Sequence, residues 1–268
     1  MKKQTKKYAP LLIIAGVLFL SACKKDDKTT GGGPTPTPVP TGTHLITRIQ
    51  QDADNYTSFN YNASGLIDRI EGKNNGEASN IALTYNAQKK INTAVTTDGA
   101  INFIYTGTTL SGMEYLDQTN NAVVAYTQFT YLNNKLSEYT QYVKYLNDNI
   151  PFTKVTYSYN GDDVETQTTY QWSVVTNQFK VSETRKFEYD NKTNPIVAAP
   201  ELAQALFQMI SAHNPVKETV YNAQNAIIET DTYSYTYDSN GYPATQTETV
   251  AKTGDPVVVK SSTYSYNN

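Results

Sequence analysis

The residues that most often carry out acid–base chemistry or bind metals are few in this sequence. It contains two histidines, His44 and His213, and one cysteine, Cys23. Histidine acts as a general base because its pKa lies near neutrality, and with thiolates it binds zinc. Neither histidine lies in a serine-hydrolase elbow or a zinc-protease helix motif. We therefore expect both to be exposed polar residues, and we predict no catalytic residue, no metal site and no cofactor.

Carboxylates are the second group that could do chemistry, because a glycosidase needs only one facing pair. Asp162, Asp163 and Glu165 lie on or just after a predicted turn, and Asp52 and Asp54 form a D-x-D sequence in a predicted loop. Neither group has the glycine and the distal glutamate of a calcium-binding loop. We expect solvated turn acids. A buried pair assembled from distant strands stays open as an alternative.

The surplus of tyrosine is the best indication of a binding function. The chain has 22 tyrosines and 8 phenylalanines, and a buried phenol needs a hydrogen-bond partner that a sheet interior rarely supplies. Many rings are therefore expected at a partly hydrated boundary. Tyr170 and Trp172 are two residues apart, so on a strand they project from one face and are predicted to stack on a sugar ring or a peptide side chain. Packing against neighbouring strands is the alternative.

These side chains must be positioned by a phrase that the sequence repeats about eight times. Most copies have two aromatic or aliphatic residues two positions apart, usually with a polar residue between them. This spacing places both residues on one face of a strand, so one face is apolar and the other polar. We call the tyrosines that end these copies the anchor tyrosines; they are Tyr61, Tyr85, Tyr105, Tyr131, Tyr159, Tyr189, Tyr221, Tyr237 and Tyr266.

Turn-forming residues follow most anchor tyrosines, as in NASG after Tyr61 and DSNG after Tyr237. Asn, Asp and Gly tolerate the backbone conformations that a tight turn requires. Each phrase therefore predicts a strand, a turn and the start of a returning strand. We predict an all-β fold, an antiparallel meander of about 14–17 strands, which at this width should curl or become barrel-like.

One segment departs from the repeat and predicts a short helix near residues 200–212. Leu202, Leu206, Met209 and Ile210 would share one helical face, with Pro200 in the first turn and Pro215 ending the helix. Such an insertion could cap or plug the curled sheet. A helix that binds a partner is the alternative.

Residues 1–22 have the features of a secretory signal peptide. A cationic start precedes an apolar run from Leu11 to Leu20, which is too short to span a bilayer. Residues 23–42 are rich in glycine and proline and predict a flexible tether, and residues 43–268 predict one β domain built from the repeats. Because Cys23 is the only cysteine, the domain cannot form an internal disulfide.

The sequence LSAC at residues 20–23 resembles the lipobox of bacterial lipoproteins. This resemblance implies cleavage before Cys23 and lipidation of its thiol. Lys25, Asp26 and Asp27 resemble the export signal of Bacteroidota surface lipoproteins, which implies lipid anchoring in the outer membrane with the domain facing the cell exterior.

The phrases YDNKTNP at 189–195 and YDSNGYP at 237–243, under this leader, resemble Bacteroidota lipoproteins with a domain of unknown function and a porin-like fold. They resemble more distantly the tyrosine-aspartate repeats of bacterial shell-forming toxins. These motifs are turn chemistry, so the resemblance implies an architecture and no activity.

Charge narrows the possible partners. The chain carries 22 basic and 25 acidic residues, and four of the lysines lie in the signal peptide. An acidic mature chain without clustered cations argues against nucleic acid as a partner. A soluble domain is favoured over a membrane-spanning barrel, because Arg185 shares with Phe187 the face that would meet lipid.

We predict a surface domain that binds a glycan or a peptide, with the membrane reached only through lipidated Cys23. A structural or adhesive surface protein is the alternative, and a hydrolase is the third possibility, so no enzymatic activity is expected. Nothing in the sequence fixes the oligomeric state.

Overall fold

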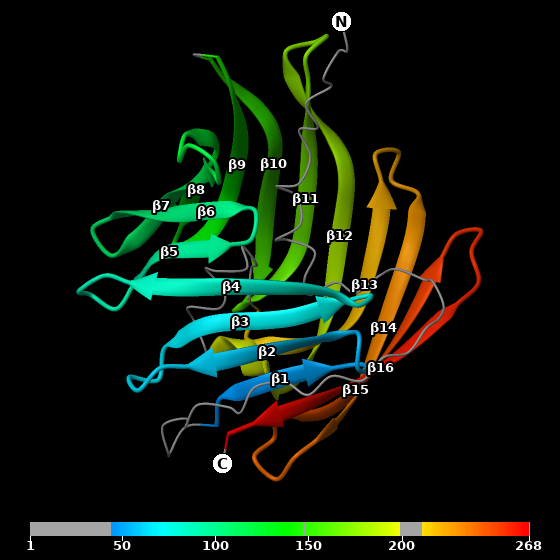
Figure 1. Ribbon diagram of the computed structural model, residues 1–268. Helices are drawn as coiled ribbons and strands as arrows, with labels where there is room; N and C mark the ends of the chain where they lie inside the picture. Colours follow the sequence, from blue (N-terminus) through cyan, green and yellow to red (C-terminus); the bar gives the residue numbers. More distant parts are fainter. Residues whose placement is uncertain (1–43, 147, 199–210, 268) are drawn as a thin grey trace, which may run out of the picture.

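The computed structural model describes residues 44–146, 148–198 and 211–267. They form sixteen strands that pair into one closed antiparallel barrel (Figure 1). Each strand pairs with its neighbours in sequence, and β1 closes the barrel against β16. The predicted all-β meander of about 14–17 strands is confirmed. The strands are β1 (Ile46–Gln50), β2 (Tyr56–Tyr61), β3 (Ile67–Asn74), β4 (Glu77–Tyr85), β5 (Ile91–Thr96), β6 (Gly99–Thr106), β7 (Thr109–Asp117), β8 (Val123–Leu132), β9 (Lys135–Tyr145), β10 (Asp148–Asn160), β11 (Asp163–Ser173), β12 (Gln178–Thr193), β13 (His213–Asn222), β14 (Ile227–Tyr237), β15 (Pro243–Lys252) and β16 (Val258–Tyr266).

The signal peptide, the tether with Cys23 and most of the helix predicted near 200–212 lie outside the described residues. A short 3-10 helix, η2 (Pro195–Ala198), precedes that gap. Ser211 and Ala212 after the gap are not helical, and β13 begins at His213. The predicted helix end at Pro215 is wrong, because this residue lies within β13 beside a bulge, where a strand tolerates proline. None of the described residues belongs to a helix that is long and apolar enough to cross a bilayer.

The interior of the barrel differs between its two halves. Figure 1 shows β1–β4 lying across β9–β12, so that the halves form opposite walls. The inward residues of β1–β7 form an apolar core, in which Ile46, Phe59, Phe103 and Met113 are at most 6% exposed. Burial of this surface is the main contribution to stability. The inward rows of β9–β16 carry many tyrosines instead, and those of β12–β16 also carry charged residues.

A β-bulge lies at the anchor tyrosine of nearly every even-numbered strand. The pairing with the next strand shifts by one residue at Tyr61, Tyr85, Tyr105, Tyr131, Tyr159, Tyr189 and Tyr237. A bulge bends the strand and increases its twist, which helps a sheet to close. Since these strands are parallel to one another, the bulges lie at one end of the barrel, which we call the anchor rim. Tyr221 lies next to the last residue of the odd-numbered β13 and is therefore at the opposite end, the far rim.

Six of the nine anchor tyrosines donate a hydrogen bond from the hydroxyl to a backbone carbonyl. Tyr61 donates a hydrogen bond to the backbone oxygen of Ile46, at 2.8 Å, and Tyr159 donates to that of Leu136, at 2.9 Å. In each case the acceptor lies at the start of the preceding strand. Tyr85, Tyr105, Tyr189 and Tyr266 repeat the arrangement with Ile67, Ile91, Val164 and Pro243. Backbone carbonyls at the anchor rim thus supply the partners that these phenols need, and all of these tyrosines except Tyr61 are only partly buried, as expected for rings at a partly hydrated boundary.

Four of the turns share one hydrogen-bond pattern. In the turn after Tyr61, the side-chain oxygen of Asn62 accepts hydrogen bonds from the backbone N–H groups of Ser64 and Leu66. The fourth residue of each turn has a positive φ; in this turn it is Gly65, with φ 76°. The same contacts recur in the turns that begin at Asn86, Asn222 and Asp238. The predicted turn chemistry is confirmed at these positions.

Candidate functional site

The structure places Tyr170 and Trp172 together on the outer face of β11. Tyr170 lies opposite Lys154 of β10 and Val181 of β12. The neighbouring row, which contains Val155 and Thr169, faces the interior. Both rings are partly exposed, so they are available to a ligand that approaches the outer wall.

These two rings are held by contacts on both sides. The ring of Trp172 packs edge-on against Phe179 of β12, with centroids 5.0 Å apart. Lys154 Nζ lies 4.8 Å from the ring centroid of Tyr170 and 5.3 Å from that of Phe179. The same ammonium pairs with Glu138 at 3.6 Å. Cation–π contacts of this kind stabilise ring positions, so cross-strand packing and partial exposure coexist here.

Two more rings extend the cluster along the outer wall. Tyr126 of β8 and Tyr142 of β9 lie opposite each other and stack, with centroids 4.5 Å apart and an interplanar angle of 7°. Burial and the neighbouring Tyr142 raise the pKa of Tyr126. We call the five outer rings of β8–β12 the aromatic belt; they are Tyr126, Tyr142, Tyr170, Trp172 and Phe179.

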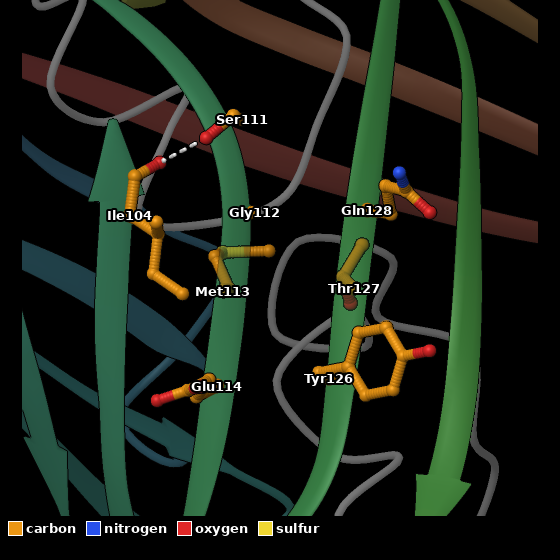
Figure 2. Close-up of a pocket in the computed structure, with 8 residues that line it drawn as sticks. All are labelled: Ile104, Ser111, Gly112, Met113, Glu114, Tyr126, Thr127 and Gln128. Atoms are coloured by element: carbon orange, nitrogen blue, oxygen red, sulfur yellow. Dashed lines mark hydrogen bonds between the residues drawn. The ribbon is translucent and has the colours of Figure 1, made fainter. Parts of the chain in front are cut away.

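A hollow lies at the end of the belt, over Gly112 of β7. Figure 2 shows Ile104, Glu114, Tyr126 and Gln128 around this glycine. The hollow has a volume of about 260 Å³, and Gly112 is one of the residues that line it. A Cβ atom there would lie 3.0 Å from the backbone oxygen of Thr127. Its polar lining includes the carboxylate of Glu114, the amide of Gln128 and the hydroxyl of Ser111.

The row structure of the sheet joins the hollow to the belt. Gly112 lies opposite Gln128, which lies opposite Thr140, and this row continues through Lys154 to Tyr170. Neighbouring strands are about 4.8 Å apart, so the row from β7 to β12 extends over roughly 24 Å. Rings and polar groups thus form one elongated surface.

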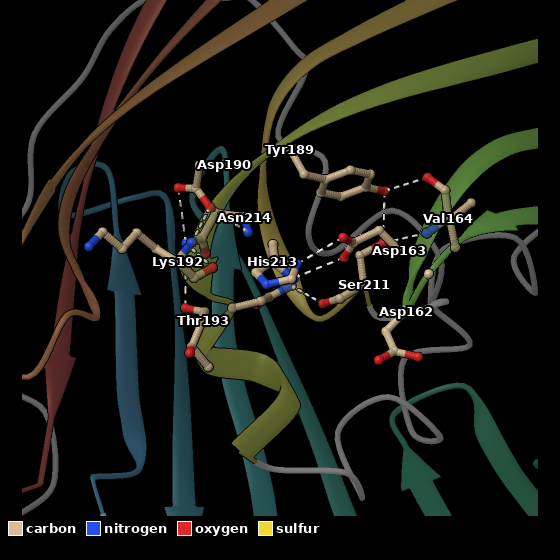
Figure 3. A network of polar contacts seen from close by, with 12 residues as sticks. Asp162, Asp163, Val164, Tyr189, Asp190, Lys192, Thr193, Ser211, His213 and Asn214 are labelled. Carbon is tan, nitrogen blue, oxygen red and sulfur yellow. Dashed lines mark hydrogen bonds and ion pairs between the residues drawn. The ribbon is translucent and has the colours of Figure 1, made fainter.

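A second cluster of polar side chains lies at the anchor rim (Figure 3). His213 Nδ1 lies 2.8 Å from Asp163 Oδ2, and the His213 backbone N–H donates to the other oxygen at 3.0 Å. Ser211 Oγ donates to the Tyr189 hydroxyl at 2.7 Å and accepts from the Val164 backbone N–H at 3.0 Å. Burial raises the pKa of Tyr189, because its ionised form would lose hydration.

This cluster fastens the chain that returns from the 199–210 gap onto β11. Ser211 Oγ is engaged by Val164 and Tyr189, and it forms no hydrogen bond with the described side chain of His213. A nucleophile requires contact with its base, so we assign these residues a structural role. The expectation of a solvated acid was wrong for Asp163, whose side chain is 16% exposed beneath His213, whereas the side chain of His213 remains 40% exposed.

The other predicted polar residues also occupy loops and rims. His44 stacks on Tyr266 with ring centroids 4.3 Å apart, and it pairs with Asp238 at 2.8 Å, so it is not freely exposed. Asp162 is exposed and pairs with Lys135, and Asp52 accepts hydrogen bonds within its own loop. In the described ranges, no three His, Cys, Asp or Glu side chains are grouped so as to hold a metal ion.

Reasoning from the sequence missed three rings of the belt and the hollow. In AYTQF, Thr127 and Phe129 face inward, so the alternation of a strand places Tyr126 on the outer face. The sequence therefore already indicated an outward ring at this position. Tyr142 and Phe179 lie on other strands, and their positions beside the belt depend on the register across the hairpins. The bulges shift this register, so the sequence alone did not reveal it.

No family model and no curated protein matches the chain. The structure is similar to a porin-like protein from Bacteroides uniformis, with 15% sequence identity and a TM-score of 0.57, over 87% of this chain and 100% of that one. It is also similar to a porin-like protein from Bacteroides vulgatus, with 12% identity and a TM-score of 0.57, over 84% and 99% of the two chains. At such identities the likeness concerns the fold. The chain thus has the porin-like barrel fold of these Bacteroides proteins, as the repeated phrases led us to expect.

Proposed function

We propose that this protein is a lipid-anchored domain on the outside of the outer membrane that binds an extracellular glycan through the aromatic belt. The observation that carries the proposal is the gathering of five partly exposed rings on one part of the outer wall. Sugar rings present apolar faces that stack on aromatic side chains. Their hydroxyls need polar partners, and Gln128, Glu114 and Lys154 lie along the belt.

The rest of the outer wall supports this assignment of the belt. On β14–β16 the outward rows consist mainly of hydroxyl side chains, such as Ser234 opposite Thr247 and Thr236 opposite Thr245. A barrel that spans a membrane needs an outward apolar band about 25 Å tall. A wall of threonine and serine favours a domain that is surrounded by water and held at the membrane by lipid.

Glycan binding can be tested with a matched pair of ring substitutions. Trp172→Ala and Tyr170→Ala remove belt rings, whereas Tyr56→Ala removes an outer ring of β2 that contacts Arg48. A glycan array identifies a ligand, and isothermal titration then measures the affinity of each variant. Loss of one stacking ring should weaken binding at least tenfold, and Tyr56→Ala should leave it unchanged. Equal affinity for all variants, or binding of peptides alone, would reject the belt as a glycan site.

An adhesive role is the second candidate, and the hairpin tips of the far rim favour it. Leu146 is 81% exposed, and Val174 and Val175 are 76% and 91% exposed. Exposed apolar tips of this kind can join one surface protein to another. Replacing all three with serine should abolish self-association if this role is correct, and should leave glycan binding unchanged.

A further inference from the structure

The inner wall of β12–β16 carries a cluster of charged side chains. Register places them on the inward face: Glu218 lies opposite Asp231, and Glu248 lies opposite Tyr233 and Lys260. We call this group the luminal cluster; it consists of Glu183, Arg185, Glu218, Glu229, Asp231, Glu248, Lys252 and Lys260. This cluster corresponds to the alternative that the sequence left open, in which carboxylates from distant strands come together.

Each acid of the luminal cluster except Asp231 has a cationic partner. Arg185 pairs with both Glu183 and Glu218. Lys252 pairs with Glu229 at 3.2 Å, and Lys260 pairs with Glu248 at 3.8 Å. None of the described lysines, arginines or histidines forms an ion pair with Asp231, so no cation balances the charge of its carboxylate.

Asp231 is also deeply placed. The residue is 6% exposed, and its Oδ1 atom is buried without a hydrogen-bond partner. An unpartnered buried carboxylate oxygen is costly, and native structures seldom contain one without a reason. Asp231 lies on the inward row of β14 among other carboxylates, and its Oδ1 lacks a hydrogen-bond donor that a ligand could supply.

Water can reach the cluster from the far rim. Lys252 precedes the β15–β16 turn at that rim, and its side chain is 41% exposed, while its partner Glu229 is 20% exposed. Glu248 and Lys260 retain 19% and 18% exposure inside the barrel. Exposure falls to 2% at Glu218, beside Asp231. Along the strands, Asp231 thus lies between the rim pair Lys252–Glu229 and the deeper, partly exposed pair Glu248–Lys260.

Two aromatic residues on the same inner wall as Asp231 indicate the kind of cation. Phe187 lies opposite Glu218, and Tyr233 is the next inward residue on β14. Aromatic rings beside a carboxylate favour an organic cation. A primary ammonium group is compact and carries three N–H donors, which suits a site lined by several carboxylate oxygens.

We propose that Asp231 is the anionic end of a luminal site that binds the primary ammonium group of a small organic cation entering from the far rim. This site is separate from the aromatic belt and does not depend on the proposed glycan binding. The ligand supplies the missing positive charge and the missing hydrogen-bond donor at once.

A proton competes with the ammonium group for the carboxylate of Asp231. Burial, followed by the charges of Glu229, Glu218 and Glu248, raises the pKa of Asp231 to about 7, and Arg185 opposes this shift. Lys252 and Lys260 face the same space but are paired with Glu229 and Glu248. Because the unfolded chain loses this proton near pH 4, the contribution of Asp231 to stability falls as pH rises from about 4 to about 7. The site is then ionised and ready for an ammonium group at pH 8.

The test measures thermal unfolding of the purified protein with n-butylammonium at pH 8 and pH 5. We expect the melting temperature to rise by several degrees at pH 8 and by much less at pH 5, where the carboxyl is protonated. n-Butanol, which has no charge, and tetramethylammonium, which has no N–H donor, should have no such effect. Asp231→Asn should abolish the rise and remove the fall in stability between pH 4 and 7, whereas the exposed Asp68→Asn should behave as the unmodified protein.

The carboxyl carbon shift of Asp231, measured by NMR in the protein labelled at aspartate, reports its protonation independently of folding stability. A protonated Asp231 at pH 8 that does not respond to n-butylammonium would show a site for a proton only and would overturn the proposal. The same melting response in Asp231→Asn as in the unmodified protein would also overturn it.

Discussion

At the scale of single residues, the anchor tyrosines act through both ends of the side chain. The ring packs among inward residues, and the hydroxyl donates to a carbonyl at the start of the preceding strand, as Tyr61 does to Ile46. The period-two spacing predicted the face on which these rings lie. It could not predict the acceptor, because the acceptor comes from a different strand, about 15 residues away in this case.

Removing one of these hydroxyls should destabilise the barrel. Tyr61 is 2% exposed, so Tyr61→Phe leaves the ring in place and deprives a carbonyl of its donor, at an expected cost of about 1–3 kcal/mol in the free energy of unfolding. Urea unfolding should show a lower midpoint with an unchanged slope. Tyr56→Phe on the outer wall is the control and should change stability by less than about 0.5 kcal/mol. Equal midpoints for the two variants would contradict a structural role for the hydroxyl of Tyr61.

At the scale of elements, the hairpin is the unit that the sequence specifies most directly. Asn62 and Asp238 begin turns with the same hydrogen bonds, so local chemistry predicts where strands end. The bulge beside each anchor tyrosine was not predictable from spacing alone, since it shifts the register by one residue without changing the alternation before it. For the same reason the sequence indicated Tyr170 and Trp172 as neighbours and did not reveal Phe179 as their cross-strand partner.

The four similar turns provide a test of backbone strain. Gly65 and Lys89 occupy equivalent positions, with φ of 76° and 58°. A left-handed conformation is unfavourable for a residue with a Cβ atom by about 1–2 kcal/mol, and the greater entropy of glycine in the unfolded chain offsets part of this difference. Gly65→Ala should therefore lower the free energy of unfolding by about 0.5–1 kcal/mol, and Lys89→Gly should raise it by a few tenths of a kcal/mol or more. Urea unfolding measures both, and changes of the same sign would refute the assignment of strain to this position.

At the scale of the whole molecule, the topology separates the two ends of the barrel. The described chain begins at the anchor rim, where His44 is held by Tyr266 and Asp238. The far rim, with its apolar tips and the exposed end of the luminal cluster, lies at the other end of the strands. A tether that ends near residue 43 would join the barrel at the anchor rim, at the opposite end from both features.

If Cys23 carries the lipid anchor, its substitution should release the protein from the membrane, because the barrel cannot replace the anchor. Cys23→Ser removes the proposed acceptor of the lipid, and the hydroxyl-rich outer wall of β14–β16 offers no apolar band to replace it. The variant should move from the membrane fraction to the aqueous phase of a detergent partition. Without acyl chains it loses the buried hydrocarbon that holds a lipoprotein at the membrane. Proteinase added to intact cells should digest the unmodified protein if the barrel faces the exterior. A Cys23→Ser protein that is exported and still requires detergent would instead mean that the strands enter the bilayer, and the outer wall would then have to rearrange to hide its threonines and serines.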